Sequence, residues 1–183
     1  MDRYDEVLTK CRNYPKDMSL GIPGKPELFP VSPHEFRNLC EGIALTGCTV
    51  DAVHSLQTMT ERYKHEYTLV LYGNTSEDLD TLFMKEYCLN PGRKGEANFS
   101  YQQLDQVKRT LRKRGGEVVY AHTHIACGTQ YNCFSLNDLK YLIRRAYITN
   151  RDTYGLLITK DGFSPIKYSI QENEFFRIQI LFA

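Results

Sequence analysis

The chain has 183 residues, enough for one domain with a hydrophobic core and too few for two full domains. Hydrophobic residues make up 42% and charged residues 25% of the chain, which is typical of a folded globular protein rather than a disordered one. Lys and Arg number 23 against 22 Asp and Glu, and this balance argues against a dedicated nucleic-acid-binding or membrane-surface protein.

The expected compartment follows from two further features. The chain has no apolar run long enough to span a membrane and no apolar signal core at its start. Its six scattered cysteines favour reduced thiols over a disulfide framework in a chain of this size. We therefore expect a cytoplasmic protein that does not bind membranes.

The first elements in chain order are an arm and two helices. Proline and glycine are frequent between residues 15 and 30, so residues 1–30 are expected to form an extended N-terminal arm outside a single domain over 31–183. Ser32 followed by Pro33 and Glu35 has capping-box spacing and predicts a helix near 33–45. After Gly47, the apolar spacing predicts a second helix to about Arg62.

The remaining segments alternate between strand and helix patterns. In chain order, we expect a strand over 66–73 ending in a Gly-Asn turn, a strand over 82–89, a helix over 101–114 capped by Ser100, a buried strand over 117–121, a helix from Ser135 to about Arg145, a hairpin of 154–159 with 166–170, and a last strand over 175–182. This alternation predicts an α/β (α+β) fold with a central mixed β-sheet flanked by helices. The basic run over 108–114 is interpreted as a solvated helix face.

Three residues have the spacing of a metal site. His122 and His124 stand at i and i+2 at the end of a predicted strand, so their side chains project to the same side. Asp138 follows one turn into the next predicted helix and adds an anionic ligand. Two imidazoles and one carboxylate leave a fourth position open on zinc, which is typical of a hydrolytic site rather than a structural one.

These residues, together with a serine and a glutamate, carry a resemblance to a known family. His122-Thr123-His124, Ser135 and Asp138 resemble the signature of the JAMM (MPN+) zinc isopeptidases. That family also has a glutamate on an upstream strand with a glycine seven residues later, and Glu66 with Gly73 fits this spacing. The resemblance covers about residues 33–170. It departs from the family in its ten-residue loop before Ser135, where seven residues are usual, and in Ile125, where the family usually has proline.

The resemblance implies a single MPN/JAB-like domain that binds one Zn²⁺ through His122, His124 and Asp138. Glu66 would act as the general base, and Ser135 would donate a hydrogen bond to the developing oxyanion. The implied reaction is hydrolysis of an amide bond in a protein or peptide substrate, including removal of ubiquitin or a ubiquitin-like tag. Glu61 is a competing candidate for the base, but it falls on the predicted helix.

Other interpretations stay open at this level. Cys127 and Cys133 with the two histidines would form a closed, structural His₂Cys₂ zinc site. The chain could also be a catalytically silent MPN-like scaffold, or a metal hydrolase that acts on a non-protein substrate. Ser135 with Asp138 is also an ordinary capping box. The other histidines, His34, His54 and His65, are expected at the surface or in packing roles.

Overall fold

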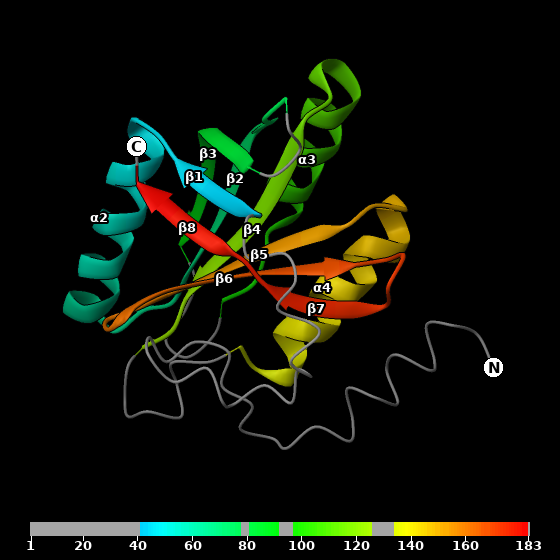
Figure 1. Ribbon diagram of the computed structural model, residues 1–183. Coiled ribbons are helices and arrows are strands. Elements are labelled where there is room, and N and C mark those ends of the chain that lie inside the picture. Colours follow the sequence, from blue (N-terminus) through cyan, green and yellow to red (C-terminus); the bar gives the residue numbers. More distant parts are fainter. Residues whose placement is uncertain (1–40, 78–80, 92–96, 126–133, 183) are drawn as a thin grey trace.

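The computed structural model describes residues 41–77, 81–91, 97–125 and 134–182. These residues form three helices and one eight-stranded mixed sheet with the strand order β7-β6-β5-β4-β2-β3-β1-β8 (Figure 1). In chain order the elements are β1 (Gly42–Leu45), α2 (Cys48–Tyr63), β2 (Tyr67–Thr75), β3 (Thr81–Pro91), α3 (Tyr101–Arg114), β4 (Glu117–Thr123), α4 (Leu136–Thr149), β5 (Thr153–Thr159), β6 (Gly162–Ser169), β7 (Glu174–Arg177) and β8 (Gln179–Phe182).

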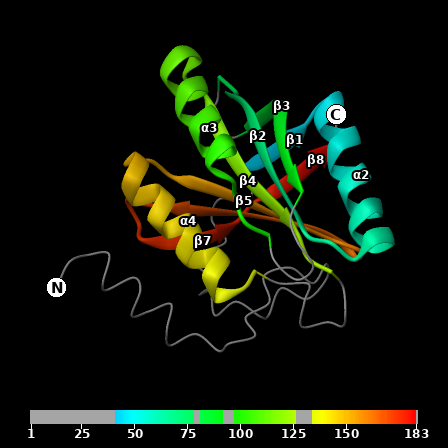
Figure 2. The same cartoon turned by 180° about the vertical axis from the view of Figure 1, so that it is seen from behind.

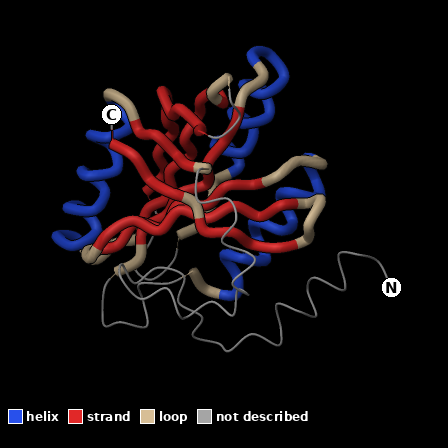
Figure 3. The backbone as a smooth tube through the Cα atoms, viewed as in Figure 1, coloured by secondary structure: helices blue, strands red, loops and turns tan. Residues whose placement is uncertain are grey.

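The helices lie outside the sheet, so the predicted α/β class with a central mixed sheet flanked by helices is confirmed (Figure 3). Helix α2 covers one face, where Val53 and Leu56 pack against strand residues such as Leu69. Helices α3 and α4 cover the other face, and both stand in front of the sheet when the molecule is seen from behind (Figure 2). Each large apolar side chain buried in these two cores contributes about 1.5–3 kcal/mol.

Strand β4 lies in the interior of the sheet and carries the histidines to one end of it. It pairs antiparallel with β2 and parallel with β5, and α4 is the crossover between β4 and β5. Because β2 is antiparallel to β4, the start of β2 lies beside the end of β4, with Thr68 opposite His122. The end of β4 and the start of β2 therefore lie side by side at one end of these strands, and the start of α4 lies next to them.

Most predicted elements are confirmed. Helix α2 ends within one residue of the predicted position, and α3 has the predicted bounds with a capping box between Ser100 and Gln103. The helix after Ser135 and the β5–β6 hairpin are also present. Residues 1–40 lie outside the described residues, so the N-terminal arm and its boundary at residue 30 stay a prediction.

The predicted helix over 33–45 is wrong where the structure describes it. Gly42–Leu45 is the short strand β1, buried along its whole length, and it pairs in parallel with both β3 and β8. A short apolar run fits a buried strand and a buried helix segment equally well by periodicity. Both neighbours of β1 come from distant parts of the chain, which the local pattern around Cys40 does not reveal.

The structure also differs from the prediction at the end of the strand over 66–73 and along the last strand over 175–182. Strand β2 continues through Gly73 to Thr75 with a register shift between Tyr72 and Gly73. A Cβ at Gly73 would lie 1.8 Å from the carbonyl oxygen of Phe83, so the close approach at this bulge requires glycine. The last predicted strand is divided at Ile178 into β7, which pairs with β6, and β8, which pairs with β1.

This division reflects the curl of the sheet. Strand β8 stands at one edge of the strand order, yet it contacts β6, which is second from the other edge. In Figure 1, β8 accordingly starts beside β6 and runs from there toward α2.

Within the described residues, no helix combines the length and apolar character that crossing a membrane requires.

Candidate metal centre

One residue of β4, the residue that directly follows β4 and one residue of α4 form a compact triangle of ligand atoms. His122 Nε2 lies 3.1 Å from His124 Nε2, and Asp138 Oδ2 lies 3.4 Å from His122 Nε2 and 3.6 Å from His124 Nε2. His122 is only 5% exposed, whereas His124 and Asp138 are partly buried. Among the described residues, this is the group of His, Cys, Asp or Glu side chains that could hold a metal ion.

The size of the triangle fits zinc. In a tetrahedral zinc site with ligand bonds of about 2.0–2.2 Å, the ligand atoms lie about 3.3–3.6 Å from one another. The three observed separations of 3.1, 3.4 and 3.6 Å fall close to that range. Two imidazoles and a carboxylate are also ligands that zinc accepts. A metal held by these three residues would have a further position available for water or substrate.

The first turn of α4 holds the acidic ligand in place. Ser135 Oγ accepts a hydrogen bond from the Asp138 N–H at 3.3 Å, and the Ser135 N–H donates to Asp138 Oδ2 at 2.7 Å. This capping box therefore fixes the same carboxylate oxygen that faces the two histidines. Burial on its own raises the pKa of Asp138, but the charge of His122 and hydrogen bonds from His122, His124 and Ser135 outweigh it and hold the pKa well below its usual range. Asp138 is thus an anion.

The glutamate candidate Glu66 lies at the same cleft. It directly precedes β2, and its Oε1 accepts a long hydrogen bond of 3.5 Å from the Ile125 N–H, just beyond the second histidine. The described residues lining this cleft of about 540 Å³ include Glu66, His122, His124, Ser135 and Asp138. Chain segments far apart in the sequence therefore bring all five predicted site residues together.

Glu61, the competing candidate, lies elsewhere. Its Oε2 pairs with Lys64 Nζ at 3.3 Å on the last turns of α2. The hollow that it lines is formed with other surface residues, namely Gln57, Thr58, Arg62 and Lys160. None of the predicted metal ligands borders that hollow. The geometry therefore separates two carboxylates that are only five positions apart in the sequence.

Thr123, between the two histidines, has a role that the sequence pattern does not show. It lies on the α2 side of β4 and is fully buried. Its Oγ1 accepts the Tyr67 N–H at 2.9 Å and forms a second hydrogen bond of 2.8 Å with the Thr60 hydroxyl. Thr123 therefore joins the end of β4 to the start of β2, next to Glu66. Its partners are 56 and 63 residues away, so no local signal could have identified them.

Aromatic rings form the wall of the cleft on the side of α3 and α4. Phe99 stacks on Tyr141 with ring centroids 5.0 Å apart, and both rings contact Tyr120 edge-on at 5.5 Å. Phe134 lies with its centroid 5.7 Å from that of His122. Because the cleft has this apolar wall beside a polar end, it suits a ligand with both apolar and polar groups.

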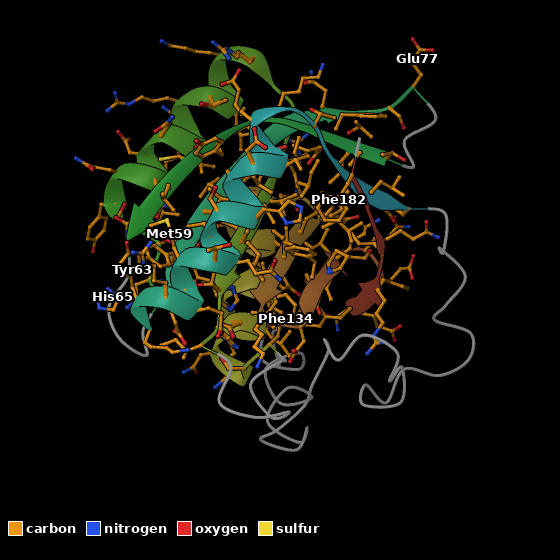
Figure 4. All side chains as sticks on the ribbon, turned by 90° about the vertical axis from the view of Figure 1, so that its left-hand side faces the viewer. Met59, Tyr63, His65, Glu77, Phe134 and Phe182 are labelled. Atoms are coloured by element: carbon orange, nitrogen blue, oxygen red, sulfur yellow. The ribbon has the colours of Figure 1, made fainter. Side chains whose placement is uncertain are left out.

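The other sequence-based candidates lie apart from this centre or outside the described residues. His54 on α2 contacts Phe163 of β6 and Phe182 of β8, and His65 is exposed beyond the C-terminal end of α2. Figure 4 shows His65 next to Tyr63 at that end, whereas Phe134 lies near the start of α4. His34, Cys127 and Cys133 lie outside the described residues, so the closed His₂Cys₂ arrangement stays a prediction.

Neither the family models nor the curated proteins compared with this chain include a match to it.

Proposed function

We propose that this protein is a zinc-dependent hydrolase of amide bonds, a peptidase or isopeptidase with an MPN/JAB-like domain of the JAMM type. One observation carries the proposal. A glutamate, a serine and a His-His-Asp triangle of zinc-like dimensions converge on one cleft from separate segments of the chain. The order and spacing of these residues is also the basis of the resemblance to the JAMM family.

The three ligands would hold the metal. When bound there, zinc supplies a Lewis acid that polarises a carbonyl group and makes water more acidic. His122 lies on β4 in the interior of the sheet, and His124, directly after β4, donates its backbone N–H to the Ile158 carbonyl of β5. Asp138 is fixed by its capping box, so the set is held by rigid elements. Asp138 also provides one negative charge against the charge of the metal ion.

Glu66 is the proposed general base, which would transfer a proton from the attacking water to the leaving amine. Its Oε1 is oriented by the Ile125 N–H, and Oε2 has no hydrogen-bond partner within the described part of the chain. Oε2 can therefore accept a proton from the attacking water and pass it to the leaving amine. If that amine is a lysine side chain, the reaction removes ubiquitin or a ubiquitin-like tag; if it is a backbone amine, the reaction is ordinary peptide hydrolysis.

Ser135 has a hydroxyl hydrogen to donate. Its Oγ uses a lone pair to accept the Asp138 N–H, which leaves the O–H free to point into the cleft that Ser135 lines. A donor beside the metal stabilises the oxyanion that forms when water adds to the scissile carbonyl. Ser135 thus has a structural role as a helix cap and a catalytic role as an oxyanion donor.

Metal analysis combined with a substrate panel tests the proposal. The purified protein is expected to bind about one zinc per chain and to cleave a member of a panel of peptides, lysine-linked isopeptides and ubiquitin-like conjugates. Asp138→Ala should remove both the zinc and the activity, whereas Cys127→Ser combined with Cys133→Ser should keep both.

The alternatives give different results in the same experiment. If the double cysteine variant loses zinc and Asp138→Ala keeps it, the closed His₂Cys₂ site is correct. If zinc binds through Asp138 but no substrate in the panel is cleaved, the protein is a scaffold or acts on a non-protein substrate.

A further inference from the structure

A buried guanidinium lies between α3 and α4, on the far side of the aromatic wall of the metal cleft. Arg145 on α4 is only 7% exposed. Its Nε donates a hydrogen bond of 3.1 Å to the Tyr120 hydroxyl, and its guanidinium carbon lies 5.5 Å from the centre of the Tyr120 ring. A neutral phenol thus provides the hydrogen bond to this cation.

The outer part of the guanidinium has no such partner. Within the described residues, neither Nη atom of Arg145 has a hydrogen bond or an ion pair, and no carboxylate lies within salt-bridge distance. Both Nη atoms reach solvent, since neither is a buried polar atom without a partner. An arginine buried this far is usually paired with an anion. The usual partner of its two Nη groups is a group with two acceptor oxygens.

A cavity adjoins these atoms. The space between α3 and α4 has a volume of about 490 Å³, and Arg145 lines it from α4. The α3 side brings a second cation, Lys108, together with Tyr101 and Leu104. Asp105 also borders the cavity, but its carboxylate is paired with the exposed Arg109. The charge available inside the cavity is therefore positive.

We propose that this cavity between α3 and α4 is a binding site for an oxyanion, a phosphate or carboxylate group held by the two Nη groups of Arg145 and by Lys108. The two parallel N–H donors of arginine match two oxygens of such a group, and lysine adds a point charge. The proposal does not depend on the metal chemistry, because neither cation borders the metal cleft.

Calorimetric titration of the intact chain with inorganic phosphate tests the site, with acetate as the carboxylate probe and chloride at matched ionic strength as the non-directional control. We expect saturable binding of phosphate or acetate at one site per chain and none with chloride. Arg145→Gln should weaken this binding by about 10-fold to 100-fold, as expected for hydrogen bonds to a charged group.

The control is Arg144→Gln, which removes the same charge from an exposed position on the same helix. It should leave binding within about twofold, because a surface charge contributes little. Binding that is equally weakened by both variants, or no saturable binding by the unmodified chain, would overturn the proposal. The absence of saturable binding is also the result expected if a carboxylate of this chain, and not a bound oxyanion, were the partner of Arg145.

A second pair of variants keeps the test decisive if Arg145→Gln does not fold. Lys108→Gln changes an exposed side chain that lines the cavity, and Lys113→Gln changes an exposed lysine on the same helix away from it. We expect the first to weaken binding several-fold and the second to have no effect. Equal effects of the two lysine variants would contradict the site. In nitrogen-15 spectra, phosphate should also shift the Nε–H signal of Arg145 in the unmodified chain.

Discussion

Thr123 Oγ1 accepts a hydrogen bond of 2.9 Å from the Tyr67 N–H, across two neighbouring strands. Tyr67 follows Glu66, and Thr123 stands between the two histidines. The bond therefore fixes the position of the proposed base, Glu66, relative to the proposed metal ligands, His122 and His124. Because it lies on the α2 side of the sheet, the other side of β4 remains available for the histidines to face the cleft.

We expect Thr123→Val to damage both stability and activity while zinc binding is retained. Valine keeps the shape but leaves the Tyr67 N–H and the Thr60 hydroxyl without their buried partner, which costs about 1–3 kcal/mol. Urea unfolding should show this loss. The turnover number should fall because Glu66 is less well placed, and Thr123→Ser should restore most of it.

The matched control for this variant is Thr58→Val on α2. Thr58 is exposed, and among the described residues its hydroxyl bonds to the His54 carbonyl within its own helix alone. Its loss should change stability by no more than about 0.5 kcal/mol and leave turnover unchanged. A Thr123→Val enzyme with normal turnover would contradict the positioning role.

Glu66→Gln should separate basicity from structure. The amide keeps the shape of the side chain and can still accept the Ile125 N–H, so the variant is expected to fold and to bind zinc. It should lose about 10²–10⁴ in rate, because a general base contributes about that much. Steady-state kinetics with metal analysis of the same sample measures both quantities.

Glu61→Gln is the comparison for Glu66→Gln. Glu61 pairs with Lys64 and does not line the metal cleft, so its amide variant should remain fully active. If Glu61→Gln were inactive and Glu66→Gln active, the base would be five residues upstream. Activity in both variants would remove the proposed proton transfer.

The two capping boxes allow the catalytic role of Ser135 to be distinguished from its role as a helix cap. Ser100 and Ser135 each cap a helix through the same reciprocal pair of hydrogen bonds. Changing either to alanine should cost about 0.5–2 kcal/mol of stability, measured by thermal or urea unfolding. Only Ser135→Ala should also lower turnover, by about 10²–10³-fold for loss of an oxyanion donor. Equal turnover in the two variants would show that Ser135 is a cap alone.

The stability of the fold is expected to decrease above about pH 10. Lys167 lies 2.9 Å from a Glu41 oxygen and 3.1 Å from Asp152. Burial lowers its pKa, but hydrogen bonds and charge from the two carboxylates outweigh this and raise it above the ordinary 10.5. A lysine whose pKa is raised by folding stabilises the fold at any pH below its unfolded pKa of about 10.5. This stabilisation is lost as the pH rises through the pKa of the folded state.

The raised pKa of Tyr154 also lowers the stability of the fold above about pH 10. Burial and the neighbouring charge of Glu41 raise its pKa above the ordinary 10.0, so ionisation in the unfolded chain also favours unfolding above pH 10. Unfolding free energies at pH 8, 10 and 11 should show the decline, and Lys167→Met should make it shallower. The exposed Lys160→Met should leave the slope unchanged, and an equal slope in all three proteins would contradict the assignment.

Elements with a local signal were predictable from the sequence. Helix α3 follows from its apolar spacing and the Ser100 cap, and α4 follows from Ser135 in the same way, because caps and helical periodicity involve residues only three or four positions apart. The alternation of β4 likewise predicts that His122 and His124 face the same side. The candidate ligands His122, His124 and Asp138 follow from this spacing, whereas the roles of Glu66 and Ser135 follow from the resemblance to the JAMM family.

Other features depend on residues that meet only in the folded chain. The local pattern predicts a helix where β1 stands, because the pairing of β1 with β3 and β8 joins it to residues about 40 and 137 positions away. The anchor at Thr123, the choice of Glu66 over Glu61 at the cleft, and the buried Arg145 likewise rest on contacts between distant segments. Local patterns in the sequence determined which residue types and elements were available, because caps, turns and alternation are short-range. The tertiary structure alone decided which of them meet, because strand pairing and burial depend on how the sheet curls.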